Sequence, residues 1–299
     1  MTKAILMYHR VCARTEETEC YFARGTGVTP ESFRAQLRWL SKRFAFATVR
    51  DLVFGESNDL PTVALTFDDG YRDVVERALP ACGEFGAVAT VYVCASTLAA
   101  PGQLWFDRYY ALVPRLRAAP HAQDIVAAEC GEPAPESDLR WWARGPLKAK
   151  LAALNREGRD ALLGRLEAAL GLGSVPAASL RYLDRTDLAS LMRAGWEVGG
   201  HGARHDRLTE LPADQLTEEL AASATMLLEL GAPKPWSIAY PDGAVDEQVR
   251  AAAAEQFGAG VTVEPELVSS SANRLHLPRL LCRGDSEIPH PSLLAALSS

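Results

Sequence analysis

The sequence predicts an α/β protein in which parallel strands are covered by helices. Short apolar runs alternate with longer segments of helical periodicity along most of the chain, and this alternation is typical of parallel sheets. The length of 299 residues suits one barrel of α/β units. Apolar residues make up 48% of the chain, which is enough for a sizeable core.

The predicted strands are apolar runs that each end in polar or turn residues. In chain order they are "AILMYH", "TVALTFDDG", "AVATVYVCAS", "GWEVGGH", "WSIAYPDG", "FGAGVTV" and "RLHLPRLLC". In a parallel barrel the carboxyl ends of the strands converge on one face, where catalytic groups collect. We therefore expect the residues that follow these runs to share a site.

The predicted helices lie between the strands. "TPESFRAQLRWLSKRF" begins with Thr29 as a cap and Pro30 at the first helical position. "YRDVVERALPACGEFG" has a helical pattern, with a kink expected at Pro80. "PADQLTEELAASATMLLELG" and "DEQVRAAAAEQFG" are the later covering helices.

The segment from about 102 to 179 breaks this alternation. It is rich in Ala, Arg and Glu and has helical periodicity in "PLKAKLAALNREGRDALLGRLEAALG", with no strand pattern. We predict a single domain over residues 1–299 with a helical insertion at about 102–179, near one mouth of the barrel. Extra packing and a substrate lid are both compatible with it.

Charge and hydropathy exclude several classes of partner. The net charge is −7 and no long basic run occurs, so nucleic acid is not an expected partner. No apolar stretch reaches the roughly 18 residues that span a bilayer. The apolar part of "MTKAILMYHRV" is too short for a signal-peptide core. Six scattered cysteines without a C-x-x-C pair fit a reducing compartment, and we expect a cytoplasmic protein.

Asp68 and Asp69 are adjacent carboxylates that follow an apolar run expected to be buried. Burial disfavours two neighbouring negative charges unless a cation or a proton compensates them. Asp-Asp-Gly is also ordinary turn chemistry after a strand. The adjacent pair alone leaves a cation site and a turn as alternatives.

A second motif, "GGHGARHDRL", places His201 and His205 four residues apart at another strand end. H-x-x-x-H spacing is weak evidence by itself. Two imidazoles and one carboxylate, however, form a common catalytic zinc set that leaves a position open for water. One aspartate would then bind the metal, and its neighbour would act as the base for the activated water.

The ordered combination of motifs resembles the polysaccharide deacetylases, carbohydrate esterase family 4, also called the NodB-homology family. The motifs are T-F-D-D-G, the histidine pair after "GWEVGGH", and a Y-P-x-G turn. The resemblance runs from about Ile5 to Arg279 without the helical insertion. It implies a distorted, TIM-like (β/α) barrel of seven or eight strands, and metal-dependent removal of N-acetyl or O-acetyl groups from sugars.

The resemblance also implies roles for individual residues. Asp68 matches the general base. Asp69, His201 and His205 match the metal ligands, with zinc expected first and cobalt, nickel, iron or manganese as alternatives. The substrate-binding turn is Tyr240, Pro241 and Asp242, in which the backbone N–H of Asp242 helps to bind the oxyanion.

The general acid has two candidates. "ILMYHRV" resembles the start of a circularly permuted branch with an N-terminal Y-H-R motif, in which His9 is the general acid. His276 in "RLHLPRL" is the rival, but it lies within an apolar alternation. His9 is preferred because it ends a strand.

Three positions depart from the family pattern. Gly202 stands where Ser or Thr is usual, so that a supporting hydrogen bond is missing. Ala239-Tyr240 stands where an arginine is usual, and Arg279 is the expected replacement that pairs with Asp68, although a surface arginine is the alternative. Asp242 replaces a common tyrosine and adds a negative charge near the substrate.

The expected function is metal-dependent hydrolysis of an N-acyl group on a cytosolic nucleotide sugar, lipid-linked sugar or glycosylated metabolite. Trp105 and Asp107 are candidate substrate contacts through stacking and polar contact, and a core role for Trp105 is the alternative. Other functions compatible with the motifs are deformylase, cyclic imidase and O-deacetylase activity, or non-catalytic glycan binding.

Overall fold

The computed structural model describes residues 2–56, 60–99, 103–172, 181–284 and 286–297. The chain divides into two compact units. A barrel unit comprises residues 1–12, 26–102 and 181–299, and a helical unit comprises residues 13–25 and 103–180. Each unit has its own buried core.

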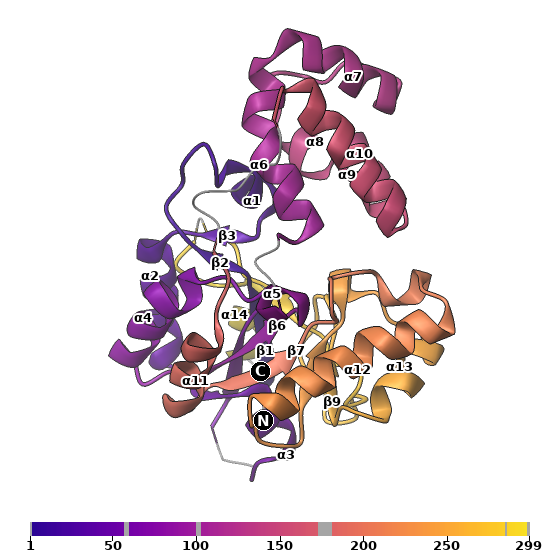
Figure 1. Cartoon of the computed structure of the whole chain (residues 1–299). Helices are drawn as coiled ribbons and strands as arrows, with labels where there is room; N and C mark the ends of the chain where they lie inside the picture. The colour runs from indigo at the N-terminus through magenta and orange to yellow at the C-terminus, as the bar shows by residue number, and fades with distance from the viewer. Residues whose placement is uncertain (1, 57–59, 100–102, 173–180, 285, 298–299) are drawn as a thin grey trace. The chain divides into compact units, whose positions relative to one another are not determined.

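The barrel unit is built on one parallel sheet. Its strands are β1 (Lys3–Tyr8), β4 (Ala45–Ala47), β5 (Thr62–Phe67), β6 (Ala89–Val93), β7 (Glu197–Gly200), β8 (Ser237–Ala239), β9 (Ala259–Val261) and β10 (Leu280–Leu281). The order is β10-β1-β5-β6-β7-β8-β9, and β4 pairs with the first half of β5. The sheet curls into a distorted (β/α) barrel (Figure 1), which confirms the predicted fold class.

The two ends of the sheet are linked by the segment before β10. The Gly260 N–H donates to the Arg274 carbonyl, and the Leu277 N–H donates to the Gly260 carbonyl. The same chain then enters β10, where Leu280 pairs with Leu6 of β1. Only the last part of "RLHLPRLLC" is therefore a regular strand, because Pro278 has no N–H to donate to a ladder.

The central strands β5, β6 and β7 are buried on both faces, as expected for a sheet covered by helices. Ile5, Ala64 and Tyr92 belong to one apolar cluster, which fills the inside of the barrel. Leu6 and Leu65 point the other way and pack in a second, larger cluster. The alternation of side chains along each strand thus separates the inside of the barrel from the layer under the helices.

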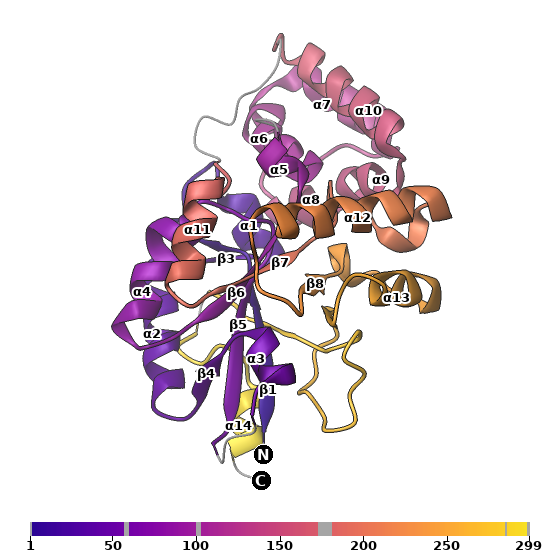
Figure 2. The same ribbon diagram turned by 60° about the horizontal axis from the view of Figure 1, so that its bottom comes forward.

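The covering helices lie on both sides of the strands in both views (Figure 1 and Figure 2). They are α2 (Pro30–Ser41), α3 (Val49–Phe54), a π-helical turn (Val74–Ala78), α4 (Leu79–Glu84), α5 (Ser96–Ala99), α11 (Arg185–Arg193), α12 (Ala213–Glu229), α13 (Glu247–Ala254) and α14 (Ser292–Leu297). Short 3-10 turns occupy Leu208–Glu210 and Pro241–Gly243, and a small ladder joins β2 (Arg10–Val11) to β3 (Gly27–Val28).

Local signals explain two helix boundaries. The Thr29 hydroxyl accepts a hydrogen bond from the Ser32 N–H, and Pro30 occupies the first turn of α2. Near Pro80, where the sequence predicts a kink, a π-helical turn gives way to α4, and Pro80 lies in the first turn of α4. Proline lacks the N–H that would continue the preceding helical ladder.

The helical unit contains α1 (Glu19–Arg24), α6 (Trp105–Ala118), α7 (Pro120–Cys130), α8 (Leu139–Arg144), α9 (Pro146–Ala153) and α10 (Arg156–Ala169). Its described residues, 13–25 and 103–172, form no strand, as predicted for the insertion. The sequence did not predict that α1 would join it; Tyr21 donates a 2.6 Å hydrogen bond to Asp107 of α6. Across the described parts of the chain, every helix is too short or too polar to cross a bilayer.

Candidate active site

Strand register brings the predicted site residues to one level. Tyr8 pairs with Phe67, so the next residues, His9 and Asp68, leave neighbouring strands together. The Asp68 N–H continues the ladder by donating to the Tyr8 carbonyl at 3.1 Å. In the same way the His201 N–H donates to a carbonyl at the end of β6. The convergence of strand ends predicted from the sequence is therefore present.

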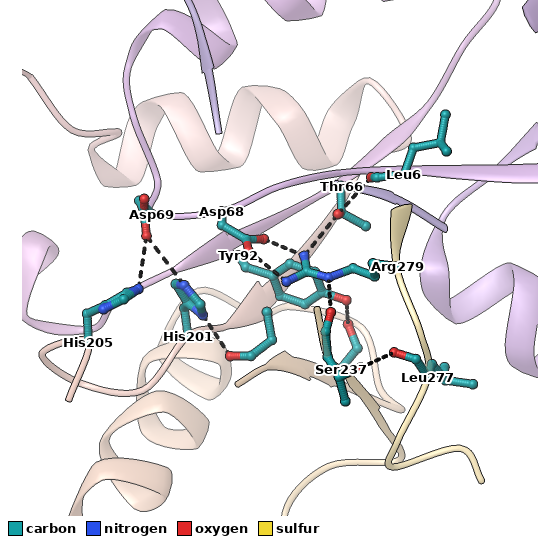
Figure 3. Close-up of polar contacts among 12 residues, drawn as sticks. Leu6, Thr66, Asp68, Asp69, Tyr92, His201, His205, Ser237, Leu277 and Arg279 are labelled. Atoms are coloured by element: carbon teal, nitrogen blue, oxygen red, sulfur yellow. Dashed lines mark hydrogen bonds and ion pairs between the residues drawn. The ribbon is translucent and has the colours of Figure 1, made fainter. Parts of the chain in front are cut away.

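Asp69, His201 and His205 form a buried cluster at this edge (Figure 3). The Nε2 atoms of His201 and His205 lie 3.4 and 3.5 Å from Asp69 Oδ1. His201 Nδ1 is 2.7 Å from the Ala239 carbonyl oxygen at the end of β8. In the neutral imidazole this contact assigns the proton to Nδ1, which leaves Nε2 as the lone-pair nitrogen that faces Asp69.

These distances fit a small divalent cation. Asp69 Oδ1 is buried and, among the described residues, accepts no hydrogen bond. Its separations from the two imidazole nitrogens, 3.4 and 3.5 Å, are long for hydrogen bonds. In a tetrahedral zinc site, bonds of about 2.0–2.2 Å separate neighbouring ligand atoms by about 3.3–3.6 Å. The residues present thus match a three-ligand metal site in their chemistry, and the two carboxylate–imidazole separations match its spacing.

The backbone at the site is unusual. In the described part of the chain, Asp69, His205 and Asp242 are the non-glycine residues with positive φ, at 73°, 60° and 53°. L-residues seldom adopt this left-handed region, although aspartate tolerates it better than most. Such conformations persist where the surroundings impose them and concentrate at functional sites. All three lie in the site motifs singled out from the sequence.

Asp68 has a different environment from that of its neighbour. Its two carboxylate oxygens accept hydrogen bonds of 2.7 and 2.8 Å from the two terminal nitrogens of Arg279 (Figure 3). Arg279 is fully buried, and it also donates to the Thr262 carbonyl and the Thr66 hydroxyl. The alternative of a surface arginine is therefore wrong, and Arg279 lies in the barrel interior beneath the site.

The charges around the two aspartates decide their protonation. Burial opposes ionisation of Asp68, but Arg279, with smaller effects from His201 and His9, lowers the pKa of the carboxyl below its usual value. Burial also opposes ionisation of Asp69, and the neighbouring histidines lower its pKa as well. Both carboxylates are thus ionised at neutral pH.

The two candidate acids lie in different places. His9 follows β1 at the level at which Asp68 follows β5, and its charge contributes to the lowered pKa of both Asp68 and Asp69. His276 instead pairs with Glu264, with 2.9 Å between Nε2 and Oε1. The structure thus brings His9, and not His276, together with the aspartate pair, and its role as general acid stays a prediction.

The Tyr240-Pro241-Asp242 turn follows β8. The Tyr240 side chain is fully buried and donates a 2.9 Å hydrogen bond to the Leu275 carbonyl, so it supports the turn from inside. Asp242 is half-buried. A contact of this turn with substrate stays a prediction.

Trp105 and Asp107 belong to the helical unit. Asp107 is buried and accepts the hydrogen bond of Tyr21, and Trp105 is packed between two cations. Lys148 Nζ lies 3.9 Å and the Arg159 guanidinium carbon 4.6 Å from the Trp105 ring centroid. Both residues have packing roles in this unit, and their predicted contact with substrate stays a prediction.

One site residue was missed by sequence reasoning. The Thr66 hydroxyl accepts from Arg279 and donates to the Leu6 carbonyl at 2.9 Å. A signal was available, because Thr66 lies two positions before Asp68 and so faces the same side of β5. The Thr66 hydroxyl thus helps to orient the Arg279 guanidinium, which binds Asp68.

Comparison with known proteins gives one family. The model of the polysaccharide deacetylase family matches residues 55–124 and 177–260, about half of the chain. No curated protein matches the sequence.

Several solved structures share the fold. A deacetylase from Streptococcus pyogenes, PplD, has 18% identity and a TM-score of 0.62, with 100% of this chain and 99% of that chain covered. IcaB from Ammonifex degensii has 16% identity and a TM-score of 0.59, with 100% and 97% covered. A de-N-acetylase from Aggregatibacter actinomycetemcomitans has 14% identity and a TM-score of 0.60, with 99% and 100% covered.

Proposed function

Because the chain belongs to the polysaccharide deacetylase family, we propose that it is a metal-dependent hydrolase that removes an N-acetyl or other short acyl group from a sugar. The observation that carries the proposal is that the two adjacent carboxylates have different partners. Asp69 faces two imidazole nitrogens, whereas Asp68 is held by Arg279. A site of this kind has a place for a cation and a separate ionised base.

Asp69, His201 and His205 would hold the cation. A divalent metal there lowers the pKa of water and polarises an acyl oxygen. Two imidazoles and a carboxylate favour zinc, with cobalt, nickel, iron or manganese as alternatives.

Asp68 is the base in the proposed reaction. Its carboxylate accepts a proton from the water whose oxygen attacks the acyl carbon. The bidentate Arg279 pair keeps Asp68 ionised and fixes its orientation. The backbone N–H of Asp242 is the proposed donor to the oxyanion that develops on the acyl oxygen.

His9 completes the reaction. When the C–N bond breaks, its imidazolium gives a proton to the departing amine, which is otherwise a poor leaving group. The products are a short carboxylic acid and a free amino sugar. His9 precedes the T-F-D-D-G strand in the chain and leaves the neighbouring strand of the sheet, which supports the interpretation of a circularly permuted branch.

We further propose a cytoplasmic enzyme whose substrate is a nucleotide sugar, a lipid-linked sugar or a glycosylated metabolite. All six cysteines are free thiols, and five of them are buried. Unpaired thiols fit a reducing compartment. An assembled wall polysaccharide would not be within reach there.

The test combines metal analysis with an assay for released acetate. Purified wild-type protein should hold about one divalent ion per chain, and His201→Ala should lose both the ion and the activity on N-acetylated sugars and nucleotide sugars. His276→Ala serves as the matched control, since that histidine pairs with Glu264 away from the aspartates. A wild-type protein that takes up no metal, even with zinc or cobalt added, would contradict the proposal.

A further inference from the structure

The loop that carries His201 and His205 is held by a carboxylate from helix α12. Glu219 is 1% exposed. Its Oε2 atom accepts hydrogen bonds from the backbone N–H groups of Ala203 and Arg204, at 2.7 and 3.0 Å. Its Oε1 atom accepts a 3.2 Å hydrogen bond from the Arg204 side chain. Two consecutive backbone donors between the candidate metal ligands thus point at one buried anion.

A second side chain of α12 holds the same loop. Ser223 follows Glu219 by four residues and therefore lies on the same helical face. Its hydroxyl donates a 2.9 Å hydrogen bond to the Gly202 carbonyl. On the other side of the loop, the N–H groups of Ala95 and Ser96 donate to the carbonyls of Gly202 and Ala203. The loop is therefore fixed between α12 and the end of β6.

Gly202 and Glu219 fit one another closely. Gly202 has φ of +67°, and a Cβ atom at this position would lie 3.3 Å from Glu219 Oε2 and 3.5 Å from the Pro241 ring. A side chain at position 202 would be strained by the backbone and would crowd the carboxylate. Since glycine has no side chain with which to hold the loop, the loop is held from outside.

Holding the loop matters because of His205. Its φ of 60° lies in the left-handed region, which few non-glycine residues adopt and which persists where the surroundings hold it. Arg204, which Glu219 binds through both its backbone and its side chain, is the preceding residue. A buried carboxylate with several donors fixes such a segment strongly, because charge-assisted hydrogen bonds are about twice as strong as neutral ones.

We propose that Glu219 is a positioning residue of the metal centre, which holds the His201–His205 loop so that the His205 imidazole faces Asp69. The inference rests on the metal site of the proposed function. In other metal sites, residues that orient the metal ligands without touching the metal contribute to affinity, and their loss typically costs about 10–100-fold. Glu219 would have the same role here.

The test measures binding of Zn²⁺ alone to the metal-free full chain, by competition with a chromophoric chelator. Glu219→Ala should raise the Zn²⁺ dissociation constant about 10–100-fold. Glu218→Ala is the matched control, because Glu218 is the neighbouring residue of the same helix and is exposed. It makes the same change in helix composition and should bind Zn²⁺ as the wild type does.

Three further variants separate positioning from general stability. Glu219→Gln keeps one acceptor oxygen and should lose less affinity than Glu219→Ala. Gly202→Ala adds a Cβ without a hydroxyl and should weaken Zn²⁺ binding by crowding the same carboxylate. Arg204→Ala removes only a half-exposed side-chain contact and should stay close to wild type. If Glu219→Ala fails to fold, Glu219→Gln and Gly202→Ala decide the question.

The outcomes are distinct. If folded Glu219 variants bind Zn²⁺ as tightly as Glu218→Ala and differ only in melting temperature, Glu219 has a structural role alone and the inference is overturned. If wild-type protein binds no Zn²⁺, the proposed metal site fails and the inference fails with it. If the Glu219 variants bind Zn²⁺ more weakly while the wild type and Glu218→Ala bind it tightly, the positioning role is established.

Discussion

The barrel unit and the helical unit both bury charged side chains, but the two regions use them differently. In the helical unit, Glu167 accepts two 2.7 Å hydrogen bonds from Arg108, and Asp107 accepts one from Tyr21. In the barrel unit, Asp69 Oδ1 faces two imidazole nitrogens at distances too long for hydrogen bonds.

The difference shows which buried charge marks a site. A carboxylate whose oxygens accept hydrogen bonds from a guanidinium or a hydroxyl is stabilised within its own unit and does not need a metal cation. A buried carboxylate oxygen that accepts no hydrogen bond, and that faces nitrogen lone pairs, needs a cation. Burial and charge alone would have ranked Glu167 beside Asp69, and the partner geometry separates them.

The largest expected effect comes from Asp68→Asn, which preserves the shape of the side chain and removes the base. Turnover should fall about 10²–10⁴-fold, the usual contribution of a general base, while Zn²⁺ stays bound through the three other residues. Steady-state kinetics and metal analysis on the same preparation measure both. Asp124→Asn, an exposed change in the helical unit, is the control. Near-normal turnover of metal-loaded Asp68→Asn would show that the base is elsewhere.

Arg279→Met should destabilise the barrel unit, because Asp68 would remain buried without its cation. Loss of one partner of a buried pair costs about 3–5 kcal/mol in the free energy of unfolding, measurable by urea denaturation at neutral pH. A loss of less than about 1 kcal/mol would contradict the assignment of a strong buried pair.

The same variant has a pH signature. Arg279 lowers the pKa of Asp68 in the folded state, so the pair stabilises the fold above the unfolded pKa, and this stability is lost as pH falls through the folded pKa. The stability difference between wild type and Arg279→Met should therefore shrink in acid. The acidic limb of the rate profile should move to higher pH in the variant, since the pKa of the base rises. If the acidic limb of the rate profile does not move, that limb reports the ionisation of a group other than Asp68.

A matching change in the helical unit sharpens the comparison. Arg108→Met leaves Glu167 buried without its main partner, and loss of a charged hydrogen bond costs about 1.5–3 kcal/mol. Hydrogen exchange should become faster in α6 and α10, whereas Zn²⁺ affinity should be unchanged. A parallel loss of Zn²⁺ affinity would mean that the Arg108–Glu167 pair also affects metal binding, against this comparison.

The smallest effect is the pH dependence of metal binding. Burial lowers the pKa of His201, but contact with Asp69 and the charges of both aspartates outweigh it, so that the pKa is raised. Imidazole binds a metal only when it is neutral. Zn²⁺ affinity should therefore fall as pH drops below this raised pKa, by about tenfold per pH unit for one displaced proton. Chelator competition across a pH series measures the slope, and a flat profile would remove His201 from the ligand set.

Sequence reasoning located most of the site because its signals are local. Apolar runs identified the strands, and the polar residues after them identified His9, Asp68, Asp69, His201 and the turn at Asp242. Parallel strands place their carboxyl ends together, so the candidates could be assigned to one site without knowledge of the strand order. The resemblance to the deacetylase family supplied their roles.

The contacts that complete the site are not local. Arg279 is 211 residues from Asp68 in the chain, and Glu219 reaches the His201–His205 loop from another helix. Residues 13–25 join the helical unit although residues 26–102 lie between them and the rest of that unit. No periodicity or spacing encodes these partners, because they depend on strand order, register and helix packing.

The sequence by itself thus determined the alternation of strands and helices, the strand ends and the chemical types gathered there, since hydrophobic period and turn chemistry act over a few residues. Hydrophobic period and spacing left open which carboxylate meets the imidazoles and which meets the guanidinium; the family resemblance proposed the pairing, and the tertiary structure shows the contacts. The adjacent side chains of Asp68 and Asp69 leave the end of β5 in different directions, and the packing of the barrel selects the partner that each one finds.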